Sequence, residues 1–170
     1  MNLYETLLEY PSLYLAARPG MGITTFAVNL AGSYLKSQNG SVVIFSCGYQ
    51  KISGKRAGNL YKERLRSYFL GESFFDAIDS LKVSGRIDNS SPGGITIKEA
   101  DFFTVDDIYK TVFENESLGL IIIDAPLIFD LTDSDELCKE DFSELLHWLG
   151  QRRIKLILTG KIGRVVEKRF

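Results

Sequence analysis

Residues 118–124 read LGLIIID, an apolar run that ends in the carboxylate of Asp124. A strand that is buried on both faces of a parallel sheet has this uninterrupted apolar character, because helices cover it from both sides. The run therefore predicts a buried strand with an acidic group at its carboxyl end. In open α/β sheets, ligands bind at that end of the strands.

Four more short apolar segments resemble this strand, and helical segments separate them. The expected strands are residues 12–17, 41–46, 95–99 and 154–159. The expected helices are residues 1–11, 23–35, 58–70, 72–82, 104–115 and 134–149, with Thr104 as a cap and Gly150 as a stop. This alternation predicts an α/β fold, with a parallel central sheet of about five strands and helices on both faces.

The length and composition are those of one globular domain. The chain has 170 residues, of which 45% are hydrophobic and 25% are charged, and this excludes a disordered chain. We expect a single domain over residues 1–170, with an N-terminal helix at 1–11, a flexible loop at 84–94 and a basic C-terminal segment at 160–170.

The charge does not demand a nucleic-acid partner. The net charge is −2, whereas an obligate binder of the phosphate backbone usually carries a basic face. The basic C-terminal segment leaves a local contact with DNA open, and the alternative is a solvated terminus. The lysines and arginines in and just before this segment are Arg152, Arg153, Lys155, Lys161, Arg164, Lys168 and Arg169.

The cysteine content and the absence of targeting signals suggest a cytoplasmic protein. Cys47 and Cys138 form no metal-binding spacing with each other or with the single His147, which fits a reducing compartment without a disulfide scaffold. The N-terminus has no signal peptide, and no apolar stretch reaches the length of a membrane span. We therefore expect a cytoplasmic location and no membrane partner.

The segment after the first expected strand is a candidate phosphate-binding loop. Residues 17–25 read ARPGMGITT, with two glycines before the start of a helix. Backbone N–H groups and the helix dipole at such a turn attract an anion. A complete phosphate loop has a lysine just before the first threonine, where this chain has Ile23, so a simple glycine-rich turn is the alternative. The candidate nucleotide-binding residues are Arg18, Pro19, Gly20, Met21, Gly22, Ile23, Thr24 and Thr25.

Thr24 and Asp124 are the candidate metal ligands. In phosphate-loop enzymes, a threonine hydroxyl and an acid at the end of a neighbouring strand hold Mg²⁺ beside the phosphates. Each residue alone is weak evidence, but together they form the two-part layout of a nucleotide site. The expected cofactor is Mg²⁺ with ATP or ADP.

Four segments together resemble a known family. They are residues 14–31 (YLAARPGMGITTFAVNLA), 42–49 (VVIFSCGY), 118–128 (LGLIIIDAPLI) and 156–169 (LILTGKIGRVVEKR). In this order they resemble the ATPase domain of DnaB-type replicative DNA helicases, which are RecA-like P-loop NTPases. The resemblance covers nearly the whole chain. It implies a RecA-like fold in which the last strand lies between the phosphate-loop strand and the strand of Asp124.

The departures from the family pattern fall on the catalytic positions. The resemblance places Ile23 at the family's phosphate-binding lysine, Gly48 at its catalytic glutamate and Lys161 at its γ-phosphate-sensing glutamine. It also places the family's arginine finger and DNA-contacting loops beyond Phe170, the last residue of this sequence. Because phosphoryl transfer depends on these charges, we assign no catalytic residue and expect no useful ATP hydrolysis by the chain alone.

Three hypotheses for the function remain. The first is a degenerate, noncatalytic domain that binds nucleotide weakly, docks to a protein partner, or does both, within a helicase-like ring or by self-association. The second is an ATPase whose phosphate site is rebuilt by Lys161 and a partner subunit, and a solvent-exposed Lys161 is the alternative. The third is a DNA-binding accessory factor of replication that uses the basic C-terminal segment.

Overall fold

The computed structural model describes residues 3–18, 20–38, 40–47, 61, 64–65, 94–100, 103–124 and 136–161. Its strands are β1 (Ser12–Ala17), β2 (Ser41–Cys47), β3 (Ile95–Ala100), β4 (Leu118–Asp124) and β5 (Lys155–Lys161). Its helices are α1 (Leu3–Leu7), α2 (Ile23–Ser37), α5 (Val105–Phe113) and α6 (Glu136–Gln151). The predicted helices 58–70 and 72–82, the loop 84–94 and residues 162–170 lie outside the described residues, except for Tyr61, Arg64, Leu65 and Gly94.

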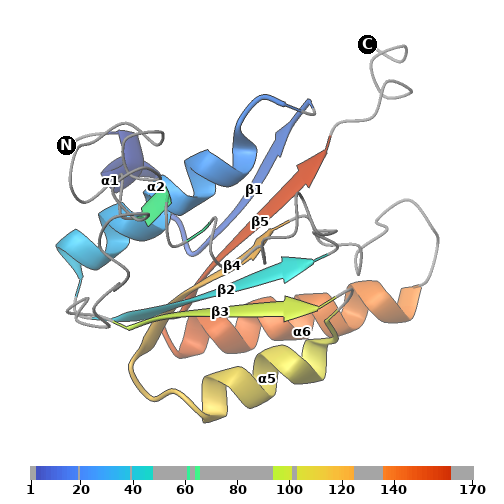
Figure 1. The fold of residues 1–170 in the computed structure, drawn as a ribbon. Helices are drawn as coiled ribbons and strands as arrows, with labels where there is room; N and C mark the ends of the chain where they lie inside the picture. The colour runs from blue at the N-terminus through green and yellow to red at the C-terminus, as the bar shows by residue number, and fades with distance from the viewer. Residues whose placement is uncertain are drawn as a thin grey trace.

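The strands form one parallel sheet in the order β1-β5-β4-β2-β3 (Figure 1). Helices α1 and α2 lie on one face, and α5 and α6 lie on the other (Figure 1). The predicted α/β fold with helices on both faces is therefore confirmed. The position of β5 between β1 and β4 is the arrangement that the family resemblance implies.

Two apolar clusters, one on each face, hold the layers together. Alternate residues of the strands point to opposite faces, so a continuous apolar run serves both clusters. In β4, Ile122 packs in the α2 cluster, whereas Ile121 and Ile123 pack in the cluster of α5 and α6. All seven residues of β4 are buried, as expected for the central strand.

The predicted boundaries are correct for the strands to within two residues, but two helix ends are wrong. The N-terminal helix is Leu3–Leu7 rather than 1–11. Helix α6 does not stop at Gly150. It ends beyond it, where Arg153 adopts the left-handed conformation (φ 58°) and the Ile154 amide donates to the Leu149 carbonyl at 3.0 Å. This pairing satisfies the terminal carbonyl and brings Ile154 into the same cluster as Leu149, so burial rather than glycine sets the end.

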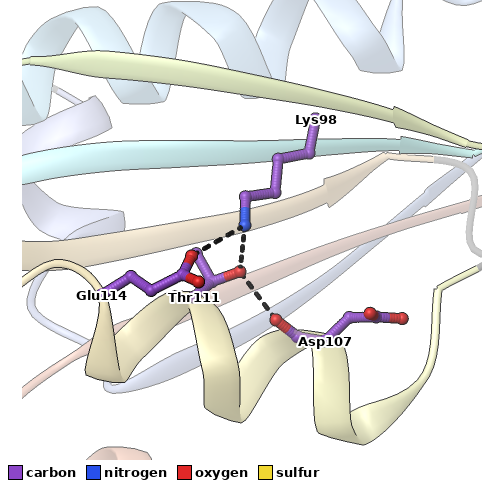
Figure 2. Close-up of polar contacts among 4 residues, drawn as sticks. All are labelled: Lys98, Asp107, Thr111 and Glu114. Atoms are coloured by element: carbon purple, nitrogen blue, oxygen red, sulfur yellow. Dashed lines mark hydrogen bonds and ion pairs between the residues drawn. The ribbon is translucent and has the colours of Figure 1, made fainter.

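The edge strand β3 is fixed to α5 by a polar contact. The Lys98 ammonium donates to the Thr111 hydroxyl at 2.7 Å and lies 3.8 Å from the Glu114 carboxylate (Figure 2). The Thr111 hydroxyl in turn donates to the backbone carbonyl of Asp107 at 2.6 Å (Figure 2). A lysine on an edge strand also discourages pairing with another chain. The contact therefore joins the edge strand of the sheet to α5.

Two local features help to place the helices against the sheet. Thr104 caps α5 as predicted, and Asp107 completes a reciprocal capping box. Gly119 gives Tyr34 of α2 room against β4, because a Cβ atom at this position would overlap the tyrosine hydroxyl. Burial raises the pKa of Tyr34.

None of the described helices is long and apolar enough to cross a membrane.

Candidate functional site

Three polar side chains lie next to one another at the carboxyl edge of the sheet. Ser46 of β2 pairs in register with Asp124 of β4. Thr159 of β5 follows Leu158, which pairs with Ile123, so Thr159 is level with Asp124 on the other side. Because Ile44, Ile122 and Ile157, two residues before each of them, belong to the α2 cluster, all three polar residues lie on the α2 face.

These residues and Tyr61 form what we call the Asp124 cage. The Thr159 hydroxyl donates to Asp124 Oδ1 at 2.5 Å, and the Tyr61 hydroxyl donates to Asp124 Oδ2 at 2.5 Å. The Tyr61 hydroxyl oxygen also lies 3.2 Å from Ser46 Oγ. Both carboxylate oxygens are therefore engaged by protein hydroxyls.

Burial makes this arrangement strong. Asp124, Thr159 and Ser46 are each 1% exposed, and Tyr61 is 3% exposed. A buried carboxylate is costly unless its oxygens accept hydrogen bonds. Each hydrogen bond to a charged group contributes about 1.5–3 kcal/mol. The cage thus connects β2, β4, β5 and the segment of Tyr61 through one acid.

The glycine loop (residues 17–25) lies at the same edge, between β1 and α2 (Figure 1). Gly20 and Gly22 have positive φ angles of 84° and 75°, which favour glycine. Gly22 is the N-cap of α2, where no side chain makes a cap hydrogen bond. The turn is held by the backbone, with the Met21 amide donating to the Arg18 carbonyl at 3.1 Å. The described part of the loop thus has two left-handed glycines directly before the N-terminus of α2, an end of the helix that attracts anions.

The loop side chains differ in exposure. Met21 is 72% exposed, Thr25 is exposed, and Thr24 is buried. Ile23, at the expected lysine position, is half-buried in the first turn of α2. Pro19 lies outside the described residues.

Thr24 and Asp124 are directed to the same edge of the α2 face. Thr24 is one helical turn before Val28, and Asp124 is two residues after Ile122. Val28 and Ile122 belong to the same core cluster. Thr24 and Asp124, the expected metal ligands, therefore lie on the same side of the sheet, with Thr24 in the helix layer and Asp124 in the sheet layer.

Lys161 is the last residue of β5 and pairs in register with Ala17, the first residue of the glycine loop. Sequence analysis placed it after the strand, and the structure places it within the strand. Its backbone is level with the entry to the loop, on the strand next to that of Asp124.

The Asp124 cage does not fit a Mg²⁺ ion as it stands. Mg²⁺ requires six oxygen ligands in near-octahedral geometry, and it usually keeps several waters. A carboxylate that is 1% exposed and has a hydroxyl against each oxygen leaves no room for such waters. Among the described residues, no group of three or more His, Cys, Asp and Glu side chains could hold a metal ion.

Comparisons with known proteins agree with the geometry. No family model matches the chain. The sequence is 28% identical over 170 residues to the replicative DNA helicase DnaB of Geobacillus stearothermophilus, in a match that covers 92% of this chain and 36% of the helicase. The chain therefore spans about a third of the length of this relative.

Two solved structures share the fold. The ATPase domain of G40P superposes with a TM-score of 0.56 at 17% identity, over 94% of this chain and 60% of that chain. A DnaB-like replicative helicase, solved to study its interactions with primase, gives a TM-score of 0.57 at 19% identity, over 92% of this chain and 41% of that chain. The chain is therefore similar in sequence to a DnaB-type helicase and shares the RecA-like fold of these two structures.

The structure places several of the predicted site residues at the same edge of the sheet, and others lie outside the described residues. The glycine loop, Thr24, Asp124 and the backbone of Lys161 meet at one edge. Gly48 lies outside the described residues. Sequence analysis missed the cage partners of Asp124. The segments SVVIFS, LGLIIID and IKLILT each end an apolar run with a polar residue, and this shared pattern could have identified Ser46 and Thr159.

Proposed function

We propose that this DnaB-type RecA-like domain is noncatalytic, binds nucleotide weakly through the glycine loop and acts by docking to a protein partner. The partner is a helicase-type ring or a second copy of the chain. The observation that carries the proposal is Ile23. The loop has the backbone geometry for an anion, but a half-buried apolar side chain stands where the lysine would neutralise phosphate charge.

The absence of a lysine at position 23 should impair hydrolysis more than nucleotide binding. Backbone N–H groups at a helix N-terminus attract phosphate without any side chain, so weak binding survives the loss of a lysine. Phosphoryl transfer needs charge stabilisation and an oriented water, and the sequence has Ile23 and Gly48 at the positions that supply them in the family. The retained frame therefore supports binding and does not support hydrolysis.

Docking to a partner follows from how related domains assemble. RecA-like domains pack side by side with nucleotide between neighbours, and a DnaB-like helicase has been solved to study its interactions with primase. The exposed apolar side chain of Met21 lies on the glycine loop, at the edge where a neighbour would meet the nucleotide. We expect such a partner to use this edge.

Calorimetry with ATP and ADP tests the nucleotide part, in Mg²⁺ and in EDTA, on the full chain. Weak binding that is reduced by Gly22→Val supports the proposal, because the bulky residue disrupts the positive-φ turn. Thr25→Ala, in the same loop with ordinary backbone geometry, is the matched control. No binding at millimolar nucleotide would show that the loop is only a turn. Hydrolysis by the chain alone would contradict the noncatalytic role.

The second candidate is an ATPase whose phosphate site is rebuilt by Lys161 and a partner subunit. The register of Lys161 with Ala17 favours it, because one cation is lost from the loop and another reaches the level of the loop on the next strand. Under this hypothesis, Lys161→Ala weakens nucleotide binding, whereas Lys155→Ala at the opposite end of β5 does not. Equal affinity in both variants would exclude Lys161. DNA contact by residues 160–170 stays a prediction.

A further inference from the structure

The Asp124 carboxylate is closed to a metal ion in part by Tyr61, a residue that lies outside the sheet. Tyr61 comes from the segment between β2 and β3, and it packs in the α2 cluster with 3% exposure. Its hydroxyl occupies Asp124 Oδ2 at 2.5 Å, while Thr159 occupies Oδ1. Because the carboxylate is 1% exposed, Mg²⁺ or a Mg²⁺-bound water reaches it only when one of these two hydroxyls moves away.

The two hydroxyls are not equivalent. Thr159 lies on β5, next to β4 in the sheet, and both strands are held by backbone pairing. Tyr61 lies outside the sheet and reaches Asp124 through a long side chain from another element. The contact that can open without breaking the sheet is therefore the one from Tyr61.

We propose that Tyr61 locks Asp124, so that a Mg²⁺–nucleotide complex gains this carboxylate only after the Tyr61 hydroxyl has left it. The lock rests on the proposed nucleotide binding by the glycine loop. It predicts that the loop binds the nucleotide phosphates while Mg²⁺ adds little affinity. Asp124 serves first as the acid that holds β2, β4, β5 and Tyr61 together, and only secondarily as a metal ligand.

The lock has a measurable consequence for affinity. When the competent state of a protein is only a fraction of the population, the apparent affinity falls by that fraction. The hydrogen bond from Tyr61 to a buried charge is of the strong class, so its removal should raise the affinity for Mg²⁺–ADP about tenfold. The affinity for ADP without metal should not change, because the glycine loop is untouched.

The test is calorimetry of ADP, in Mg²⁺ and in EDTA, with the wild type, Tyr61→Phe and Tyr34→Phe. Tyr34 is the matched control, since it is a buried tyrosine of the same cluster whose hydroxyl lies at Gly119 rather than at Asp124. The expected result is tighter binding of Mg²⁺–ADP in Tyr61→Phe alone. Equal Mg²⁺–ADP affinity in the wild type and Tyr61→Phe would overturn the lock.

The failure of nucleotide binding can be told apart from the failure of the lock. If ADP binds to none of the variants, the nucleotide part of the proposed function is wrong, and thermal melting in a Mg²⁺ series without nucleotide decides the lock. Tyr61→Phe should then gain a Mg²⁺-dependent rise in Tm that the wild type and Tyr34→Phe lack, and an equal response in all three overturns it. If Tyr61→Phe does not fold, Thr159→Val releases the other oxygen and should shift both measurements in the same direction.

Discussion

The glycine loop and the Asp124 cage lie at the same edge of the sheet, but different interactions hold them in place. The loop is a backbone structure in which Gly20 and Gly22 adopt positive φ angles and Met21 is 72% exposed. The cage is a side-chain structure whose members are at most 3% exposed and whose acid accepts two short hydrogen bonds. One half of the site is open to solvent, and the other is closed by the protein itself.

This difference means that the two halves should respond differently to substitution. A backbone frame does not depend on the identity of nearby side chains, so the loop geometry is compatible with isoleucine at position 23. A buried acid cannot remain without partners, so its position is kept for stability even if no metal binds there. Retention of Asp124 is therefore not evidence of metal binding by itself, and the two halves must be tested separately.

The largest expected effect is on stability, from Asp124→Ala. The substitution leaves the hydroxyls of Tyr61 and Thr159 buried without their acceptor and opens a cavity at the edge of β4. We expect a loss of about 2–4 kcal/mol in the free energy of unfolding, because each buried hydroxyl that loses its acceptor costs about 1–3 kcal/mol. Urea denaturation monitored by circular dichroism measures it.

A matched substitution in the glycine loop should have only a small effect on stability. Thr25→Ala, in the exposed part of the glycine loop, should change the free energy of unfolding by less than about 0.5 kcal/mol. A loss of similar size for Asp124→Ala and Thr25→Ala would break the distinction between the two halves.

The next effect is on binding, from Ile23→Lys. Ile23 lies in the first turn of α2, so a lysine there returns a cation to the loop. We expect nucleotide affinity to rise 10- to 100-fold, about 1.4–2.8 kcal/mol, with or without Mg²⁺. Met21→Lys adds the same charge two residues earlier, so it controls for the effect of charge alone. If both variants gain equally, the gain is nonspecific attraction rather than a phosphate contact.

The backbone of the loop gives a smaller and purely conformational effect. A Cβ at Gly22 meets no atom within 4 Å, so Gly22→Ala costs only the positive φ of 75°, about 1–2 kcal/mol. Gly150 of α6 is also unobstructed, but it lies in a helix, so Gly150→Ala should stabilise by about 0.5 kcal/mol. Chemical denaturation of the two variants should give changes of opposite sign. Changes of the same sign would mean that the loop glycine is not strained.

The sheet and the loop could be predicted from the sequence because their signals are local. LGLIIID contains both the buried strand and its terminal acid, and ARPGMGITT contains both glycines of the turn. The cage could be predicted only in part. Ser46 and Thr159 end apolar strands, but Tyr61 reaches Asp124 across 63 positions of sequence, and no local pattern marks such a contact. The end of α6 was missed because the burial of Ile154, not Gly150, determines it.

The last prediction concerns Asp107, an exposed acid that, like Asp124, accepts hydrogen bonds from protein donors. The backbone N–H and the hydroxyl of Thr104 lower the pKa of Asp107, which closes the capping box of α5. A lowered pKa in the folded state means that Asp107 stabilises the protein above its unfolded pKa of roughly 3.9, and that this contribution is lost as the pH falls through the folded pKa. Because the side chain is exposed, we expect less than about 1 kcal/mol.

Urea denaturation of the wild type and Asp107→Asn between pH 6 and the acid limit of folding measures this contribution. The wild type should be more stable at pH 6, and the two curves should converge as the pH falls below roughly 3.9 and through the lowered folded pKa of Asp107, where the carboxylate becomes protonated. Asp106→Asn, on the same turn but outside the capping box, controls for net charge. A constant difference at all pH values would mean that the charge of Asp107 does not contribute. The difference between Asp107→Asn and Asp124→Ala then shows what burial adds. The hydrogen-bond donors around the buried Asp124 should contribute several times more to the free energy of unfolding.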